Sequence, residues 1–235
     1  MSEALLATGR DIYYSVCNWG DEDTTSWAPG ISNSWRTTQD IAREGNVWQS
    51  MKANFLKNLV SASKAGKGGW NDPDMLQVGN GLLSADEETT HFALWAFSKA
   101  PLLIGCDLTT ISTESLEVLT NDEMIRINQD SLGNQATEFT TLAKGDLKAY
   151  SANVLLEDDS AWLAILWVNW SDSDVSDDIQ LLPFEAGLAN SPNDWCDFWD
   201  LMTGEYSRQR ASAFANYPAL AVHASYAIRV RCLPF

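Results

Sequence analysis

Residues 84–106 read SADEETTHFALWAFSKAPLLIGC, and this stretch indicates how the first part of the chain is built. Ser84 with Glu87 three residues later is the pattern of a capped helix start, and Pro101 is expected to end that helix. The apolar run at residues 102–106 then predicts a buried strand. A helix followed at once by a short apolar strand is the unit from which α/β domains are made.

The same alternation extends to both sides of this stretch. A buried strand is expected at residues 11–15, before a loop rich in Gly, Asp and Pro at residues 20–34. Apolar residues then recur at helical spacing over residues 48–59, and a further helix is expected over residues 113–128. The chain up to about residue 130 therefore predicts successive strand and helix units.

From residue 140 the pattern changes to alternating apolar and polar residues. Runs such as 161–167 (AWLAILW) and 226–230 (YAIRV) predict strands separated by turns rich in Asp, Ser, Gly and Pro. Strands of this kind are typical of an antiparallel β-sandwich. We therefore expect two domains, an α/β domain at residues 1–135 and an all-β domain at residues 136–235.

Composition excludes several classes of function. The net charge of −17 argues against a nucleic-acid partner, because phosphate binding needs clustered Lys and Arg. The four cysteines and two histidines do not have metal-ligand spacing, so neither a metal nor another cofactor is expected. The sequence contains no apolar run of about 18 residues, so no membrane span is predicted. Cys196 and Cys232 are expected either to form a disulfide or to remain free buried thiols.

Two features of the sequence concern whether the protein is secreted. The first six residues lack the basic start of a signal peptide, so we expect Met1 to be an internal methionine and a signal peptide to lie on a preceding segment. Asn169-Trp170-Ser171 is a glycosylation sequon, which fits secretion, although such triplets are about as often accidental. We therefore expect a secreted glycoprotein and treat Asn169 as its candidate glycosylation site.

Polar and aromatic residues concentrate between residues 15 and 76, directly after apolar runs. Catalytic groups of βα barrels sit on the loops that follow the strands, so these residues are the first candidates for a site. Tryptophans among carboxylates favour carbohydrate, because an indole face packs on a sugar ring while Asp and Arg bind its hydroxyls.

These motifs together resemble glycoside hydrolase family 27, and most of all its plant and fungal α-galactosidases. They are residues 1–5 (MSEAL), 8–10 (TGR), 14–20 (YSVCNWG), 33–36 (NSWR) with 40–41 (DI), 69–76 (GWNDPDML), 100–104 (APLLI) and 127–130 (INQD). The resemblance implies a (β/α)8 TIM barrel followed by an antiparallel β domain. Residues 1–135 would then be the C-terminal half of the barrel, about strands 5 to 8.

The resemblance also implies an activity, the hydrolysis of terminal α-linked galactose with retention by two carboxylates. Asp40 matches the family's acid/base residue. The matching nucleophile is an Asp at the end of the fourth strand, upstream of Met1, so the isolated chain is expected to be inactive. The substrates expected are galactose-containing oligosaccharides or galactomannan.

Six further residues are implied as substrate contacts. Arg36 matches a substrate-binding arginine, Asp74 matches a galactose-binding aspartate, and Met75 packs beside it. Trp19 matches an aromatic residue near the 2-hydroxyl of galactose, and Asn18 stands where some relatives have Glu. The sixth is Cys17, expected as a free thiol on the pocket wall.

Three alternatives stay open. An α-N-acetylgalactosaminidase or a β-L-arabinopyranosidase would differ in a few pocket residues, and the bulk of Trp19 near the 2-position disfavours an N-acetyl group. A galactose-binding fragment without catalysis is the alternative from another functional class. The oligomeric state is left open.

Overall fold

The computed structural model describes residues 1–156, 160–175 and 177–234. The first part contains a parallel sheet of three short strands, β1 (Ser15–Val16), β2 (Ser34–Arg36) and β3 (Trp70–Asp72), in that order. Before and between these strands lie the short helices α1 (Ser2–Leu6) and α2 (Thr24–Trp27), and 3-10 turns at Asp21–Asp23, Ala28–Gly30 and Ala62–Lys64. Of these three strands only β1 overlaps a segment that was expected to be a strand, residues 11–15; β2 and β3 were not predicted.

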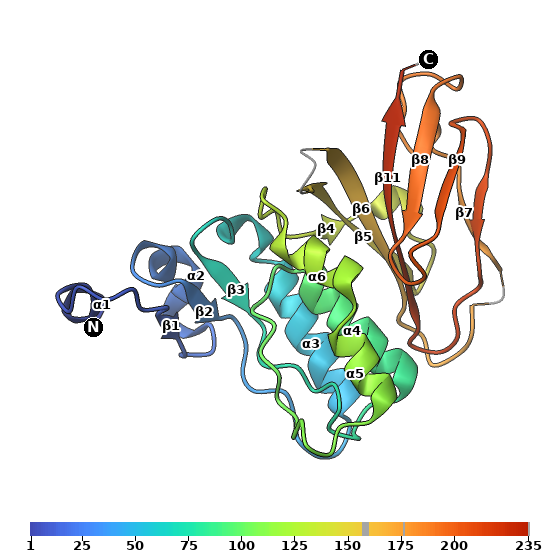
Figure 1. The fold of residues 1–235 in the computed structure, drawn as a ribbon. Helices are drawn as coiled ribbons and strands as arrows, with labels where there is room; N and C mark the ends of the chain where they lie inside the picture. Colours follow the sequence, from blue (N-terminus) through green and yellow to red (C-terminus); the bar gives the residue numbers. More distant parts are fainter. Residues whose placement is uncertain (157–159, 176, 235) are drawn as a thin grey trace.

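Four longer helices, one between β2 and β3 and three after β3, form a layer beside this sheet (Figure 1). They are α3 (Val47–Leu59), α4 (Ala85–Phe97), α5 (Thr113–Leu119) and α6 (Asp122–Gln129). The expected capping box opens α4, with both hydrogen bonds between Ser84 and Glu87 formed. The single helix expected over residues 113–128 is wrong, because Asn121 accepts a hydrogen bond from the Met124 amide and starts a second helix there.

Two expected strands are also largely wrong. Residues 11–14 lie outside any strand, and β1 begins only at Ser15. Residues 102–106 make only an isolated parallel bridge, between Ile104 and Leu76. Apolar character predicted both segments, but a strand also needs a neighbour on which to pair. In the described part of the chain β1 pairs on one side only, with β2.

The second part is antiparallel, as expected. Six strands form one sheet in the order β4 (Thr137–Glu138), β5 (Leu147–Leu155), β6 (Ala161–Asn169), β11 (Ser225–Leu233), β8 (Trp195–Asp200) and β9 (Tyr206–Arg210). A 3-10 turn, Thr140–Leu142, lies between β4 and β5. β7 (Ile179–Leu181) pairs with β10 (Ala215–Tyr217) in a second, two-stranded sheet. The strands expected at residues 161–167 and 226–230 are therefore confirmed.

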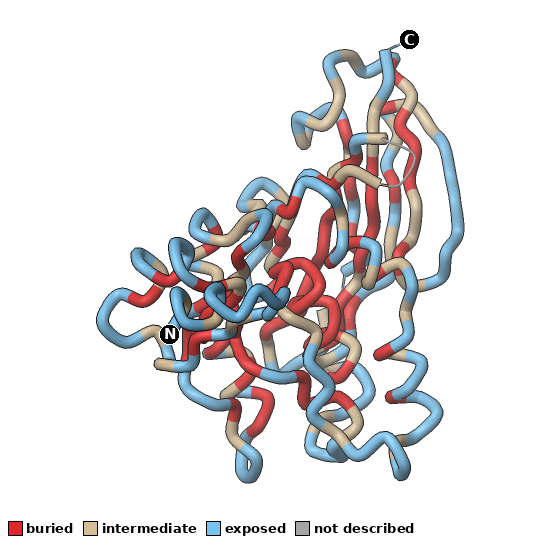
Figure 2. The backbone as a smooth tube through the Cα atoms, turned by 60° about the vertical axis from the view of Figure 1, so that its left-hand side comes forward, coloured by how far each residue is buried: buried red, intermediate tan, exposed pale blue. Residues whose placement is uncertain are grey.

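The two faces of the six-stranded sheet pack against different partners. One face shares a hydrophobic cluster with the helices, in which Trp48 lies 5.4 Å from Trp170 and Phe55 lies 5.0 Å from Tyr150, measured between ring centroids. The other face packs against the two-stranded sheet. Buried residues accordingly run from the helix layer into the sheet in Figure 2.

Two questions left open by the sequence concern single side chains. Cys196 and Cys232 stand opposite each other on β8 and β11 and form a disulfide, while Cys17 and Cys106 are free. Asn169 has no exposed surface, and its side-chain amide donates hydrogen bonds to the carbonyls of residues 173, 220 and 221. A glycan on that nitrogen is incompatible with this packing, so the expected glycosylation site is not available in the folded chain.

Candidate functional site

The carboxyl ends of the three parallel strands bring the sequence motifs to one edge of the sheet. The register places Val16 beside Trp35, and Arg36 beside Asp72. Cys17 directly follows β1, Arg36 ends β2, and Asp74 follows β3 by two residues. Residues more than fifty positions apart in the sequence are therefore neighbours where catalytic groups of βα proteins lie.

The Arg36 guanidinium connects two carboxylates. Its Nη2 lies 3.0 Å from Oδ1 of Asp40, and its Nη1 lies 3.1 Å from Oδ1 of Asp74. Nη2 also donates to the Thr38 carbonyl. Arg36 is only 8% exposed, whereas the Asp40 side chain is 60% exposed and that of Asp74 is 12% exposed. One buried cation thus holds an accessible carboxylate and a sheltered one.

Asp74 is fixed through every polar group it has. Its φ of 102° lies in the region that non-glycine residues rarely adopt. Its amide donates to Asp72, and its carboxylate accepts hydrogen bonds from the amides of Ile41, at 2.7 Å, and Met75, at 2.8 Å. Its carbonyl accepts one from the Trp95 indole. The carboxylate is therefore an immobile acceptor in the wall of the site.

A pocket of about 600 Å³ opens over these groups. Five of the predicted site residues line it: Cys17, Arg36, Asp40, Asp74 and Met75. The other lining residues are Ile41, Arg43, Gln77, Asn80, Leu82 and Gly105. Sequence reasoning missed this second group. Arg43 and Gln77 lie three residues after Asp40 and Asp74, so their closeness to the motifs was the available signal.

Asn18 and Trp19 lie outside this set of lining residues. Both carbonyl and amide of the Asn18 side chain are engaged within their own loop, with Thr24 and the Asp21 carbonyl. Trp19 is 43% exposed and has a φ of 62°. Gly20 packs so closely on Thr37 that a Cβ there would come 2.5 Å from the Thr37 carbonyl oxygen, so the loop is fixed against the end of β2.

Burial perturbs two ionisable groups behind the pocket. It raises the pKa of Asp72, although the Asp74 amide and Arg36 act in the opposite direction. Burial lowers the pKa of His91 to about 3, so this imidazole is neutral and its Nε2 can accept the hydrogen bond of the Gln77 amide. Neither residue lines the pocket; they lie behind the loops that do.

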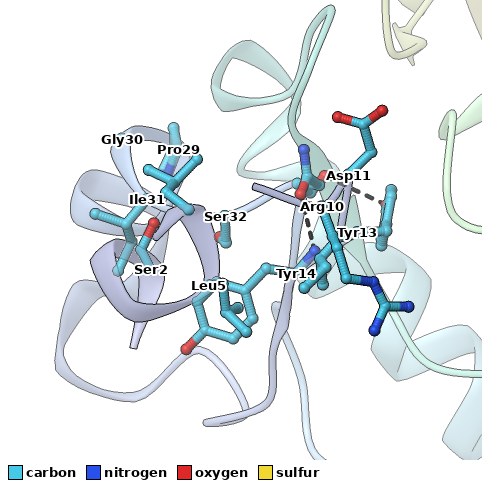
Figure 3. Close-up of a pocket in the computed structure, with 13 residues that line it drawn as sticks. Ser2, Leu5, Arg10, Asp11, Tyr13, Tyr14, Pro29, Gly30, Ile31 and Ser32 are labelled. Carbon is cyan, nitrogen blue, oxygen red and sulfur yellow. Dashed lines mark hydrogen bonds between the residues drawn. The ribbon is translucent and has the colours of Figure 1, made fainter. Parts of the chain in front are cut away.

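A second hollow, of about 580 Å³, lies between α1 and the segment that leads into β1 (Figure 3). Leu5, Tyr13 and Ile31 line it together with the exposed Arg10 and Asp11. It contains one carboxylate, Asp11, and none of the predicted site residues. The pocket around Arg36 is therefore the better candidate for a catalytic site.

The described residues form neither a metal centre nor a membrane span. They contain no group of three or more His, Cys, Asp or Glu side chains that could hold a metal ion. They also contain no helix that is long and apolar enough to cross a bilayer.

Comparisons with known proteins agree with the motifs. Residues 1–130 match the family model described as alpha galactosidase A. Alpha-galactosidase 2 of Arabidopsis thaliana is 40% identical over 217 residues, which cover 92% of this chain and 52% of that protein. The alpha-galactosidase of Cyamopsis tetragonoloba is 45% identical over 177 residues, which cover 73% of this chain and 42% of that protein.

A solved structure extends the likeness to the whole fold. Alpha-galactosidase I of Mortierella vinacea superposes with a TM-score of 0.81 at 27% identity, over 98% of this chain and 61% of that one. The chain spans between about a third and about half of the length of the curated relatives it matches. Its motifs, its fold and these matches agree, and the chain belongs to the alpha galactosidase A family, within glycoside hydrolase family 27.

Proposed function

We propose that this chain supplies the acid/base side of a retaining α-galactosidase site. The observation that carries the proposal is the Arg36 bridge between Asp40 and Asp74, because it separates two carboxylates into different roles. The exposed Asp40 can approach a bound glycoside. The sheltered Asp74 can only accept hydrogen bonds.

Asp40 is the proposed acid/base residue. Its carboxyl protonates the glycosidic oxygen as the leaving group departs, and its carboxylate later takes a proton from the attacking water. The contact with Arg36, at 3.0 Å, supports this role because it holds the carboxyl at the pocket edge while leaving most of its surface open. Proton transfer to a substrate oxygen needs both position and access.

Asp74 and its neighbours are the proposed galactose receptor. Oδ1 of Asp74 already faces the Met75 amide and Arg36, whereas Oδ2 accepts only from the Ile41 amide among the described residues, so Oδ2 can accept a further hydrogen bond from a sugar hydroxyl. Arg36 can donate to sugar oxygens beside it, and Met75 and Cys17 contribute apolar wall. Asn18 and Trp19 are proposed to border the sugar from the adjoining loop, where the exposed indole is available for packing against it.

The nucleophile is proposed to come from polypeptide other than these 235 residues. Retention requires two carboxyl groups roughly 5–5.5 Å apart, both able to reach the sugar. Among the described residues that line the pocket the carboxylates are Asp40 and Asp74, and Asp74 is committed to Arg36 and two amides. We therefore propose that the isolated chain does not turn over substrate.

This view fits a partial barrel. Three parallel strands with helices between and after them are consistent with the C-terminal half of a (β/α)8 barrel at residues 1–135, followed by a β domain at residues 136–235. In the described part of the chain β1 pairs only with β2, so its other edge is where a preceding barrel strand would pair. The Cys196–Cys232 disulfide supports an oxidising compartment and hence secretion.

The proposed substrates are galactose-containing oligosaccharides or galactomannan, from which terminal α-linked galactose is removed. The curated relatives reported above carry the name alpha-galactosidase, which favours this substrate over the N-acetylgalactosamine and arabinopyranose alternatives.

A fusion tests the proposal. The N-terminal segment of the Arabidopsis thaliana relative that this chain does not match is placed before Met1, and hydrolysis of raffinose and of a nitrophenyl α-galactoside is measured. We expect no turnover by the 235-residue chain and turnover by the fusion. In the fusion, Asp40→Asn should lower raffinose hydrolysis by about 10²–10⁴-fold, because this leaving group depends on general acid catalysis.

Asp86→Asn is the matched control, since Asp86 is an exposed carboxylate in the first turn of α4 and lines neither hollow. It should leave turnover unchanged. Hydrolysis by the 235-residue chain alone, or an Asp40→Asn fusion as fast as its parent, would refute the assignment.

A further inference from the structure

Two aromatic side chains of α4 hold the site loop at residues 74–77 from behind. The Trp95 indole donates a hydrogen bond to the Asp74 carbonyl at 2.7 Å, and the Gln77 amide donates one to Nε2 of His91 at 3.0 Å. His91 and Trp95 are one helical turn apart, their rings are perpendicular with centroids 4.1 Å apart, and both are fully buried. Their two hydrogen bonds hold both ends of the four-residue loop at residues 74–77.

These hydrogen bonds are needed because Asp74 has an unfavourable backbone conformation. A non-glycine residue with φ of 102° keeps that conformation only where its surroundings impose it. The Asp74 amide is held by Asp72, and the Trp95 indole holds the carbonyl on the other side of the same residue. Without the indole N–H, a buried carbonyl would lose its partner and the peptide could rotate.

Rotation of the Asp74 peptide would alter the position of Asp40. Oδ2 of Asp74 accepts a hydrogen bond from the amide of Ile41, the residue after Asp40. Oδ1 of Asp74 forms an ion pair with Arg36, which also pairs with the Asp40 carboxylate. We infer that Trp95 is a positioning residue of the site: through the Asp74 carbonyl it fixes the carboxylate that in turn orients Arg36 and the Asp40 loop, with His91 fixing the far end. The effect on galactose rests on the proposed function, whereas the positioning does not.

A purely structural role for Trp95 would be that of a buried ring in the core. Trp48 provides the comparison, because it is 3% exposed and belongs to the same hydrophobic cluster. Its indole N–H has no hydrogen-bond partner among the described residues. Trp48→Phe therefore removes an indole from this core without removing a hydrogen bond, and Trp95→Phe removes both.

The test is amide hydrogen exchange by NMR on the 235-residue chain, with each rate compared at equal global stability. In Trp95→Phe we expect the Ile41 and Met75 amides to lose about fivefold or more in protection, since one net hydrogen bond corresponds to about that factor. In Trp48→Phe the same amides should keep the parent protection. Equal behaviour of these amides in the two variants would overturn the inference.

His91 offers an independent variant if Trp95→Phe does not fold. His91→Gln keeps an acceptor near the Gln77 amide and should retain its protection, whereas His91→Leu should lose it by a similar factor. Loss in both variants or in neither would contradict the positioning role. The galactose affinity of the fusion is measured alongside. If amide protection changes as expected but the fusion does not bind galactose, the positioning role stands and the proposed function is refuted.

Discussion

Acid should destabilise this protein through one buried histidine. His91 is fully buried, and its Nε2 must remain unprotonated to accept the Gln77 amide. Burial lowers its pKa from 6.5 to about 3. A group whose pKa is lower in the folded state than in the unfolded state stabilises the fold above the unfolded pKa, and that contribution is lost as pH falls from about 6.5 towards 3.

The size of the effect follows from that window. Between pH 6.5 and pH 4.5 the unfolded chain binds a proton at this residue that the folded chain does not. Two pH units at about 1.36 kcal/mol each give a loss of about 2.7 kcal/mol. This is a large part of the 5–15 kcal/mol by which domains are usually stable.

The assay is urea unfolding at pH 7 and pH 4.5. Other groups also titrate in this range, so the quantity compared is the change in unfolding free energy between the two pH values. His91→Gln and His91→Leu should both show a change smaller than the parent by about 2.7 kcal/mol, because neither side chain can be protonated. They will differ in absolute stability, since only Gln keeps an acceptor. If both variants lose as much stability in acid as the parent, the reasoning is refuted.

Three further outcomes are expected in the same unfolding assay. Arg36→Gln should lower the unfolding free energy by about 3 kcal/mol, because the sheltered charge of Asp74 loses its cation; a loss below about 1 kcal/mol would contradict the bridge. Burial raises the pKa of Asp72, so the stability that its protonated carboxyl contributes at low pH is lost as pH rises above about 3.8. The unfolding free energy of Asp72→Asn should therefore rise relative to that of the parent between pH 3.5 and pH 7. A constant difference across that range would count against it. Replacing Cys196 and Cys232 together by Ala should cost about 3–4 kcal/mol, given their separation of 36 residues, and reducing the parent should abolish the difference.

The sequence predicted features that depend on neighbouring residues. The Ser84 and Glu87 capping box formed as expected, because both partners lie within one helical turn. The break at Asn121 was overlooked, since apolar residues continue on both sides of it and conceal a cap of the same local kind. Strands were overestimated at residues 11–15 and 102–106, because their extent depends on neighbouring strands that local composition does not report.

The candidate site was predicted in outline for a related reason. Motifs that end parallel strands converge on one edge, so Arg36, Asp40 and Asp74 came together as expected. The bridge of Arg36 to both carboxylates, and the left-handed conformation of Asp74, depend on loop geometry that the residue types alone do not specify. Likewise the burial of Asn169 depends on contacts with residues some fifty positions later.

The hydrophobic cluster shared by the helices and the six-stranded sheet has a practical consequence. Trp48 and Phe55 come from one side of the proposed boundary at residues 135 and 136, and Tyr150 and Trp170 come from the other. Dividing the chain there would expose one aromatic ring of each pair to water, so we expect neither piece to fold as a soluble, independent unit. Heating the intact polypeptide should accordingly give one calorimetric peak, and shuffling β domains between homologues will succeed only when the facing aromatic residues travel with them.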